Sequence, residues 1–484
     1  MNTATLITFI VYLVGMLAIG FAAYRLTSNL SDYVLGGRRL GPGVAALSAG
    51  ASDMSSWLLL GLPGAMYAGG MNQIWIAVGL AIGAYLNWQF VARRLRSYTE
   101  VANDSITIPD YLENRFRDGS KFLRVISALV ILLFFTFYTS SGLVGGAKLF
   151  VSSFGLTYNQ ALWIGAIVII SYTFLGGFLA VSWTDFIQGI LMFLALIIVP
   201  IVAISNIGGW GETVNAAGSI DPAYLDVFQD MTTLGIISLL AWGLGYFGQP
   251  HILVRFMAVR SIKDIPTARL IGMGWMVLSL FGAIFTGFAG IAFFADNPLP
   301  DSETVFIEFT QILFNPWVAG FLLAAILAAI MSTIDSQLLV SSSAVAEDFY
   351  KAILRKNASE RELVWVGRIS VLAIALIAIL LASDQDSKVL ELVSYAWGGF
   401  GAAFGPVIIL SLFWKGMTRN GALAGIIVGA LTVVIWKPLE GGIFDLYEIV
   451  PGFVLGWIAI MIFSKVGPQP SNEILEEFDK AKNL

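Results

Sequence analysis

Four oxygen-bearing side chains stand close together in the long apolar segment 324–337. They are Ser332, Thr333, Asp335 and Ser336. On a helix, Ser332 and Ser336 share a face because they are four positions apart, and Thr333 lies beside them. Hydroxyl and carbonyl oxygens with little net charge suit a small hard cation, so the group favours Na⁺. Alternatively, the hydroxyls bond back to carbonyl groups of their own helix or pack against a neighbouring helix.

A second polar group interrupts the apolar segment that extends from about 42 to 67. Residues 48–57 read Ser-Ala-Gly-Ala-Ser-Asp-Met-Ser-Ser-Trp. A lone acid at bilayer depth, here Asp53, costs roughly 3 kcal/mol even on lenient insertion scales. Irregular backbone at that depth is tolerated only where protein or a water-filled cavity covers it. We therefore predict a broken helix at an ion or substrate site.

A third segment, 232–254, carries Gly243, Gly245, Gly248 and Pro250 close together. Glycine and proline in this number predict a second broken helix. Transporters built from inverted repeats place such breaks at matching positions in their two halves. The two interrupted spans lie five spans apart, which predicts two inverted five-helix repeats, spans 2–6 and 7–11.

Composition places most of the chain in a membrane. The 484 residues are 57% hydrophobic and 12% charged, with a mean hydropathy of +0.82, whereas soluble domains are about 25% charged. The chain has no cysteine and a single histidine, His251. These leave little from which to build a metal site or a membrane enzyme, so we expect no enzyme. The apolar runs predict an all-α polytopic protein with about thirteen spans: 4–24, 42–68, 73–92, 122–150, 159–179, 184–206, 232–254, 267–294, 317–346, 363–383, 387–413, 419–437 and 445–464. A shorter stretch, 302–313, is expected to be an external or re-entrant helix.

The positions of basic residues give the orientation. With the N-terminus outside, 24 of the 27 Lys and Arg residues, Arg255 among them, fall in inner loops or the tail, and only Lys148, Lys388 and Lys437 do not. This asymmetry predicts an outer N-terminus and a cytoplasmic C-terminus. We expect a single transporter domain, 1–484, in the bacterial inner membrane. Its polar tail, 466–484, is expected to be a solvated helix or a disordered end.

Further candidates follow from position alone. Asp185 begins the sixth predicted span, where an acid is favourable as an N-cap or in the first turn. His251 is expected to be structural or to lie near the inner surface. An aromatic wall can hold an apolar ring and attract an ammonium group, although core packing is the alternative for each ring. Four aromatic residues could form such a wall: Trp57, Tyr138, Trp242 and Tyr246.

Several motifs in order along the chain resemble those of the solute:sodium symporter family. They are residues 35–42 (LGGRRLGP), 48–57, 107–116 (TIPDYLENRF), 176–185 (GGFLAVSWTD) and 248–256 (GQPHILVRF). The resemblance covers nearly the whole chain and is strongest to the bacterial proline carriers of the family. It implies two inverted five-helix repeats, alternating access, and Na⁺-driven uptake of L-proline.

The resemblance also implies roles for individual residues. The family's sodium site would fall on the backbone carbonyls of Ala51, Met54 and Ala329 and the hydroxyls of Ser332 and Thr333. Asp53 matches an acid that proline symporters need for sodium-coupled transport, and Arg38 in the first inner loop matches a position important for coupling. The expected substrate-binding residues are Ser55, Trp57, Tyr138, Trp242, Tyr246 and Pro250.

A second cation site is a further expectation. Some relatives bind a second sodium with an acid matching Asp185 and hydroxyls matching Ser332 and Ser336. The familiar proline symporter has Ser then Cys where this chain has Asp335 and Ser336, so the extra carboxylate leaves one-to-one coupling open.

Other functions stay open at this point. The same machine could carry another small carboxylate or amino acid. A proton-driven carrier is a rival, because Asp53, Asp185 and Asp335 could titrate. A channel is a different class, and the sequence lacks the repeated filter motif or charged pore ring that a channel would show. We expect a protein that works as a monomer in the lipid bilayer, with Na⁺ and the solute as partners and no nucleic acid.

Overall fold

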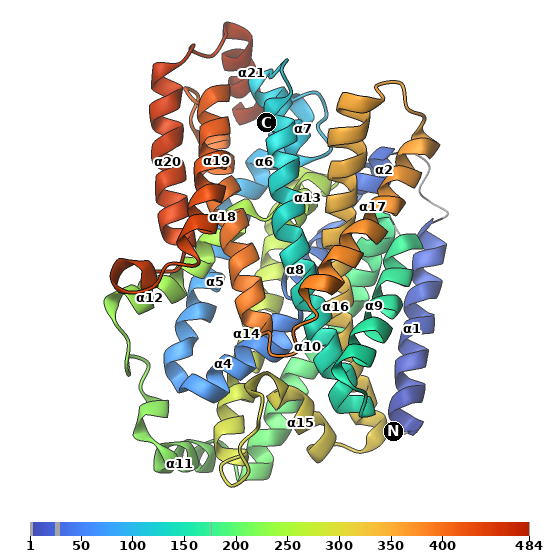
Figure 1. Ribbon diagram of the computed structural model, residues 1–484, viewed down its shortest axis with the longest axis vertical. Helices are drawn as coiled ribbons and strands as arrows, with labels where there is room; N and C mark the ends of the chain where they lie inside the picture. The colour runs from blue at the N-terminus through green and yellow to red at the C-terminus, as the bar shows by residue number, and fades with distance from the viewer. Residues whose placement is uncertain (1–2, 25–29, 176, 484) are drawn as a thin grey trace.

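The computed structural model describes residues 3–24, 30–175 and 177–483. Within these ranges the chain is helical, and the β-type pairing is limited to one isolated parallel bridge between Leu40 and Val259. The two ends of the chain lie at opposite ends of the molecule (Figure 1), as an odd number of membrane crossings requires. The predicted all-α fold is therefore confirmed.

Every predicted span corresponds to helix in the structure. Ten helical segments of the described chain are long and apolar enough to cross a membrane, and two shorter apolar ones add to them, Tyr158–Ser171 and Thr233–Gly248. The uninterrupted helices are α1 (Thr3–Tyr24), α8 (Phe122–Phe154), α9 (Tyr158–Leu175), α10 (Phe178–Ile207), α14 (Ile265–Phe293), α17 (Glu360–Leu381), α18 (Val389–Phe413), α19 (Arg419–Trp436) and α20 (Ile449–Val466). Two more continue through π-helical turns: α5 (Ile74–Leu86) through η4 (Asn87–Val91) into α6 (Ala92–Val101), and α16 (Pro316–Ser343) into η9 (Ala344–Leu354).

Both predicted breaks are present. The second span consists of α3 (Pro42–Asp53), a non-helical turn, η2 (Trp57–Gly61) and α4 (Leu62–Gly69). The seventh consists of α12 (Thr233–Leu240), the 3₁₀ turn η6 (Ala241–Gly248) and α13 (Pro250–Ala258). Gln249 between the last two is extended, with φ −80° and ψ 108°. Pro250 then starts α13 at a position where its missing N–H costs nothing.

Close packing explains the glycines of the seventh span. A Cβ atom on Gly245 would collide with the indole of Trp397, and one on Gly248 would collide with the carbonyl of Phe400. Gly83 of α5 and Gly243 of η6 likewise meet backbone to backbone. Only glycine permits such close approach, so these positions hold η6 between α5 and α18.

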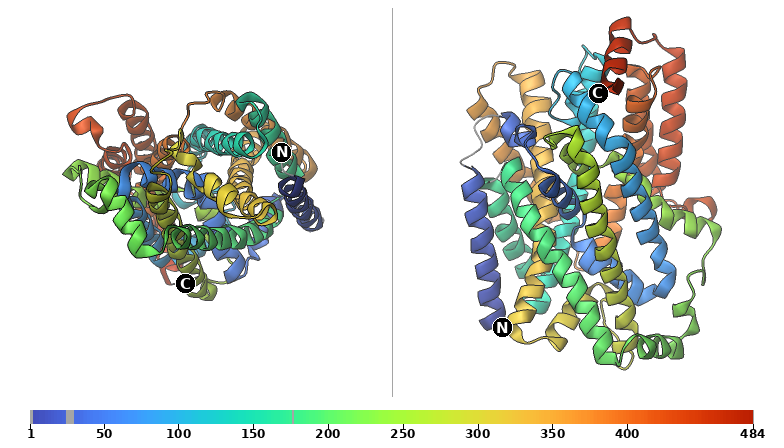
Figure 2. Two further views of the ribbon diagram at one scale, coloured as in Figure 1. Left: turned by 90° about the horizontal axis from the view of Figure 1, so that it is seen from below. Right: turned by 180° about the vertical axis from the view of Figure 1, so that it is seen from behind.

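The broken helix α3 lies at the centre of the bundle. It packs against α10, α13, α14 and α16, which come from both halves of the chain. In the rear view of Figure 2, α10 and α14 lie on the near face of the molecule, and their contacts with α3 cover it from that side. The breaks of the second and seventh spans are thereby enclosed by protein, as irregular backbone at membrane depth must be.

Shorter elements close the two ends of the molecule. At the end that holds the N-terminus, η8 (Ser302–Thr304) and α15 (Val305–Leu313) form the predicted extra helix, next to α11 (Trp210–Ile220) (Figure 1). There Glu303 accepts hydrogen bonds from Lys148 and from the first N–H groups of α18, and Asp301 pairs with Lys148 and Lys388 at 2.7 Å. At the other end lie α2 (Leu30–Leu35), α7 (Ile108–Phe116) and α21 (Asn472–Asn483).

The tail is more ordered than the sequence suggested. Helix α21 is docked: Phe478 is 6% exposed, with its ring edge-on to Tyr98 at 6.0 Å and beside the guanidinium of Arg115 at 5.2 Å. Arg117 pairs with Glu473 and Glu477 on the same helix. Of the two alternatives expected for the tail, a solvated helix or a disordered end, the structure shows a helix, and its Phe478 and Ala481 are buried against the rest of the protein.

Candidate functional site

The end of α3 frees a backbone carbonyl at the centre of the protein. In a continuous helix the N–H of Ser55 would donate to Ala51, but here it donates to the carbonyl of Asp53 at 2.9 Å. Met54 lies in the turn itself, with φ −79° and ψ 75°. The carbonyl of Ala51 is thus left without its helical partner.

Hydroxyl groups of α16 meet that carbonyl. Ser332 Oγ donates to the carbonyl of Ala51 at 2.8 Å and lies 3.2 Å from that of Ala329, and Thr333 Oγ1 lies 3.4 Å from Ala51 O. Ser332 and Thr333 are at most 1% exposed. The structure therefore brings together four of the five predicted sodium ligands and places Met54 beside them in the break. A cation among these oxygens would replace hydrogen bonds that the hydroxyls otherwise make to the carbonyls.

Asp53 is buried and is hydrogen-bonded by the side chains of three aromatic residues, Trp57, Tyr138 and Tyr246. The hydroxyl of Tyr246 donates to its Oδ2 at 2.6 Å, whereas Oδ1 has no hydrogen-bond partner. The backbone carbonyl of Asp53 accepts from Trp57 Nε1 and Tyr138 Oη, both at 3.1 Å. Residues of α3, η2, α8 and η6 are therefore joined through one residue in the broken span.

The predicted aromatic wall is assembled around this break. The rings of Trp57 and Trp242 are 6.4 Å apart, and Tyr246 stands edge-on to Trp397 at 5.0 Å. All four are buried. Ser55 lies beside Trp57, with its Oγ 3.4 Å from the backbone nitrogen of Trp57. The sequence did not single out Trp397, because an indole in a long apolar span carries no signal of its own.

The residues expected at a second cation site surround an arginine. The guanidinium of Arg255 donates to Ser48 Oγ at 3.0 Å, Asp185 Oδ2 at 3.1 Å and Ser336 Oγ at 2.7 Å. Asp335 lies next to Ser336, with its Oδ1 3.4 Å from that hydroxyl. Oδ1 of Asp185 and Oδ2 of Asp335 have no hydrogen-bond partner. Arg255 is therefore paired with Asp185, Asp335 lies beside the hydroxyl that Arg255 also contacts, and none of these side chains is exposed.

Two expectations from the sequence are wrong here. Asp185 does not begin its helix, because α10 starts at Phe178 and Asp185 is two turns inside it. Arg255 is not in an inner loop but is fully buried in α13. A buried pair joins residues 70 positions apart in the chain, and neither partner predicts the other from sequence alone.

Arg38 ties together three segments at the C-terminal end of the molecule. Its guanidinium donates to Asp104 at 2.9 Å, to the carbonyl of Met257 at 2.7 Å and to that of Ser105 at 2.8 Å. Burial lowers the pKa of Arg38, and the nearby Asp104 opposes the shift. The loop before α3 is thus bonded to the end of α13, where the bridge from Leu40 to Val259 adds to the link.

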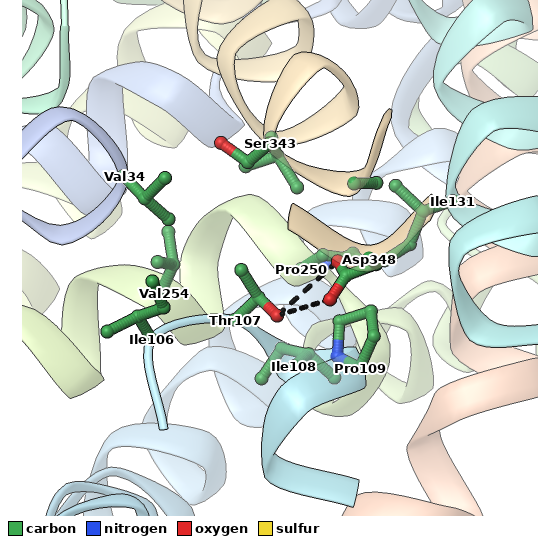
Figure 3. A pocket seen from close by; sticks show the side chains of 12 residues that line it. Val34, Ile106, Thr107, Ile108, Pro109, Ile131, Pro250, Val254, Ser343 and Asp348 are labelled. Carbon is green, nitrogen blue, oxygen red and sulfur yellow. Dashed lines mark hydrogen bonds between the residues drawn. The ribbon is translucent and has the colours of Figure 1, made fainter. Parts of the chain in front are cut away.

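A mostly apolar cavity lies between the breaks and the C-terminal end. Pro250 lines it, with other side chains from α2, α8, α13, α16, η9 and the start of α7 (Figure 3). The hydroxyl of Thr107 closes it by donating to the Asp348 carboxylate at 3.2 Å. Arg124 lies 3.6 Å from Asp348. Asp348 and Arg124 were not among the residues expected from the sequence to be functional.

His251 lies deeper than expected. It is 0% exposed, and its ring is edge-on to Phe135 at 5.4 Å and to Tyr138 at 6.0 Å. Of the two alternatives expected for His251, structural or near the inner surface, the second is wrong, because α13 begins at the break in mid-bundle. Among the described residues, no group of three or more His, Asp or Glu side chains gathers as a metal cluster. The oxygens available to a cation are therefore mainly hydroxyls and carbonyls.

The chain matches known proteins along most of its length. The profile described as the sodium:solute symporter family matches residues 33–429. The chain is 57% identical to the sodium/proline symporters of Salmonella typhimurium and Escherichia coli, over 99% of this chain and 96% of each relative. It is also 57% identical to the high-affinity proline transporter PutP of Bacillus subtilis, over 96% of this chain and 98% of that one.

Solved structures share the fold. A Na⁺-coupled sialic acid symporter, in a substrate-bound outward-open state, superposes with a TM-score of 0.82 at 21% identity, covering 97% of this chain and 99% of that one. Mhp1, a nucleobase-cation-symport-1 family transporter, superposes with a TM-score of 0.54 at 15% identity, covering 94% and 99%. The whole described bundle, with its interrupted helices, is thus a transporter architecture.

Proposed function

The chain belongs to the sodium:solute symporter family, and from this premise we propose that it is a secondary active symporter that couples inward Na⁺ flux to the uptake of L-proline. The observation that carries the proposal is the meeting of the α16 hydroxyls with the carbonyl that the break in α3 sets free. The relatives named for proline transport, at 57% identity over nearly the full length, support the choice of solute. The protein carries solute and ion rather than catalysing a reaction.

We assign Na⁺ to the carbonyl oxygens of Ala51, Met54 and Ala329 and the hydroxyls of Ser332 and Thr333. These groups offer five neutral oxygens, a donor set that suits a hard monovalent cation. An ion held there joins α3 of the first half of the chain to α16 of the second half. Na⁺ therefore stabilises the relative position of the two halves that the solute site requires.

We assign L-proline to the space bordered by the aromatic wall and the breaks. Rings there can pack on the pyrrolidine ring, and the free Oδ1 of Asp53 can accept from the secondary ammonium group. The side chains that would form the site are Ser55, Trp57, Tyr138, Trp242, Tyr246 and Pro250. Because Asp53 and the ion ligand Ala51 belong to the same broken helix, each ligand should raise the affinity for the other.

We propose alternating access between two ends of the molecule that are each held by polar contacts. One is held by Lys148, Asp301 and Glu303, and the other by Arg38 and the bond from Thr107 to Asp348. We propose that the first end faces outward and the second faces the cytoplasm. The protein would work as a single-domain monomer in the bacterial inner membrane, with its C-terminus inside.

A second cation position at Asp185 and Asp335 is a separate proposal. Arg255 neutralises one carboxylate, and each acid keeps an oxygen without a partner. Sodium dependence of uptake with a Hill coefficient above one, reduced towards one in Asp185→Asn, is the expected result. A coefficient near one that is the same in the variant would contradict the second position while leaving the first intact.

The experiment that tests the proposed function is uptake of labelled L-proline into proteoliposomes. We expect accumulation with an inward Na⁺ gradient and none without it. Competition by a panel of amino acids and small carboxylates then decides between proline and another solute. Uptake driven equally well by a proton gradient in Na⁺-free buffer would contradict Na⁺ coupling.

A further inference from the structure

Two fully buried polar side chains near the solute site carry nitrogen atoms without hydrogen-bond partners. Both ring nitrogens of His251 are without one, and so is Nε2 of Gln337. Both residues are 0% exposed. A buried polar group without a partner costs about 1–3 kcal/mol, and such a cost in a central position calls for a ligand or a functional reason.

The two side chains border one face of α8. The ring of His251 meets Phe135 and Tyr138, and Oε1 of Gln337 accepts from Thr139 Oγ1 at 3.2 Å. Phe135, Tyr138 and Thr139 are three and four positions apart, so they lie on the same side of their helix. His251 on α13 and Gln337 on α16 therefore face α8 at the same level.

That level lies between the solute site and the inner cavity. Gln337 follows the ion ligand Thr333 by four residues, which is one helical turn, and His251 directly follows Pro250 at the break. One further turn along the same three helices, the apolar side chains of Ile131, Val254 and Val340 line the cavity of Figure 3. His251 and Gln337 therefore lie along α13 and α16 between the breaks and the side chains of the cavity.

The free atoms define what they can bind. The carbonyl oxygen of Gln337 is already used by Thr139, so its amide offers only N–H donors. An imidazole carries at least one N–H in either protonation state. Donors from two helices match an acceptor with two oxygens. We propose that His251 and Gln337 bind the carboxylate of the amino-acid substrate on the inward side of the break, which rests on the proposed function.

The test compares L-proline with L-prolinamide, which lacks the carboxylate, as competitors of labelled uptake. Variants His251→Phe and Gln337→Met keep the side-chain volume but remove the N–H donors. In the unaltered protein proline should compete better than its amide. Each variant should weaken inhibition by proline about tenfold, as one lost hydrogen bond to a charged group predicts, and leave inhibition by the amide nearly unchanged.

Controls separate binding from folding. Ser279→Ala removes another buried hydroxyl without a partner, on α14, and should leave the proline-to-amide ratio unchanged. His251→Gln and Gln337→Asn keep an N–H donor and should recover part of the preference for proline. Monodisperse elution of each purified variant, with a melting temperature close to that of the unaltered protein, shows that it is folded.

An unchanged ratio in both folded variants, or equal weakening of proline and its amide, would overturn the inner carboxylate site. Failure of the proposed function looks different, because the unaltered protein would then show no Na⁺-driven proline uptake. In that case the same variants are measured with the transported acid found by the solute panel and the amide of that acid.

Discussion

At the scale of single residues, the proposed sodium site depends on polar atoms that change partners at the break in α3. Ser55 turns its N–H to Asp53, and the carbonyl released on Ala51 receives Ser332. The types of these residues and their place in apolar spans could be predicted from the sequence. Which atoms meet could not, because Ala51 and Ser332 are 281 residues apart.

The partner of Asp53 gives a prediction at this scale. Tyr246→Phe removes the hydroxyl that donates to Oδ2 and leaves both carboxylate oxygens without a partner. A buried acid that loses such a bond costs about 1–3 kcal/mol, so the Na⁺ concentration for half-maximal uptake should rise about tenfold. Tyr158→Phe, which loses a bond to the carbonyl of Ala382 far from the site, is the matched control. Equal Na⁺ dependence in the two variants would contradict a link between the ion site and the bond from Tyr246 to Asp53.

Arg255 shows where prediction from the sequence stops. Its charge placed it in a cytoplasmic loop, since a buried arginine is rare and its partner is not visible in one sequence. The structure pairs it with Asp185, Ser48 and Ser336. The acid and one hydroxyl had been singled out as cation ligands, and the structure adds that a side-chain cation already lies among them.

At the scale of elements, glycine contacts fix the seventh span against its neighbours. Gly83→Ala would drive a methyl group into the backbone of Gly243 and should cost about 2–3 kcal/mol or prevent folding. Gly274→Ala on α14 has no atom near the added methyl group and should be neutral or slightly stabilising. Melting temperatures in detergent compare the two, and equal values would show that α5 and η6 are packed less closely than described.

The ion pairs of Asp301 with Lys148 and Lys388, beside η8, predict that the stability of the folded protein depends on pH. Burial alone would raise the pKa of Asp301, but hydrogen bonds from Lys148 and Lys388 outweigh it and lower that pKa. A carboxyl group with a lowered pKa stabilises the folded protein above its unfolded pKa of about 3.9, and this stability is lost as the pH falls further. Asp301→Asn should therefore lower the melting temperature at pH 6. The fall in melting temperature between pH 6 and a pH below 4 should be smaller in this variant than in the unaltered protein. The exposed Asp296, changed to Asn, should do neither.

The two breaks were predictable as elements because their causes are local. Gly243, Gly245, Gly248 and Pro250 mark the seventh span, and polar residues around Asp53 mark the second. The π-helical continuation η9 and the docking of α21 were not predicted. Both make contacts with residues distant in the sequence, η9 with Arg124 and α21 with Tyr98, which one sequence does not reveal.

At the scale of the whole molecule, inward Na⁺-coupled uptake requires that the protein have one fixed orientation in the membrane. The chain has no cysteine, so single cysteines can be introduced without altering others. Asn215→Cys in α11 should react with a membrane-impermeant thiol reagent in intact cells, because that end is expected to face outward. Ser471→Cys before α21 should react only after the membrane is made permeable. The opposite labelling pattern would contradict the orientation.

The central claim is that Na⁺ joins the two halves of the molecule between the break in α3 and the hydroxyls of α16. The most direct test is the Na⁺ dependence of labelled proline uptake in proteoliposomes that contain Ser332→Ala or Thr333→Ala, with Ser279→Ala as the control. Loss of one oxygen ligand should raise the half-maximal Na⁺ concentration at least tenfold in both variants and leave the control unchanged. Na⁺-driven uptake with the same half-maximal concentration in all three variants would contradict it.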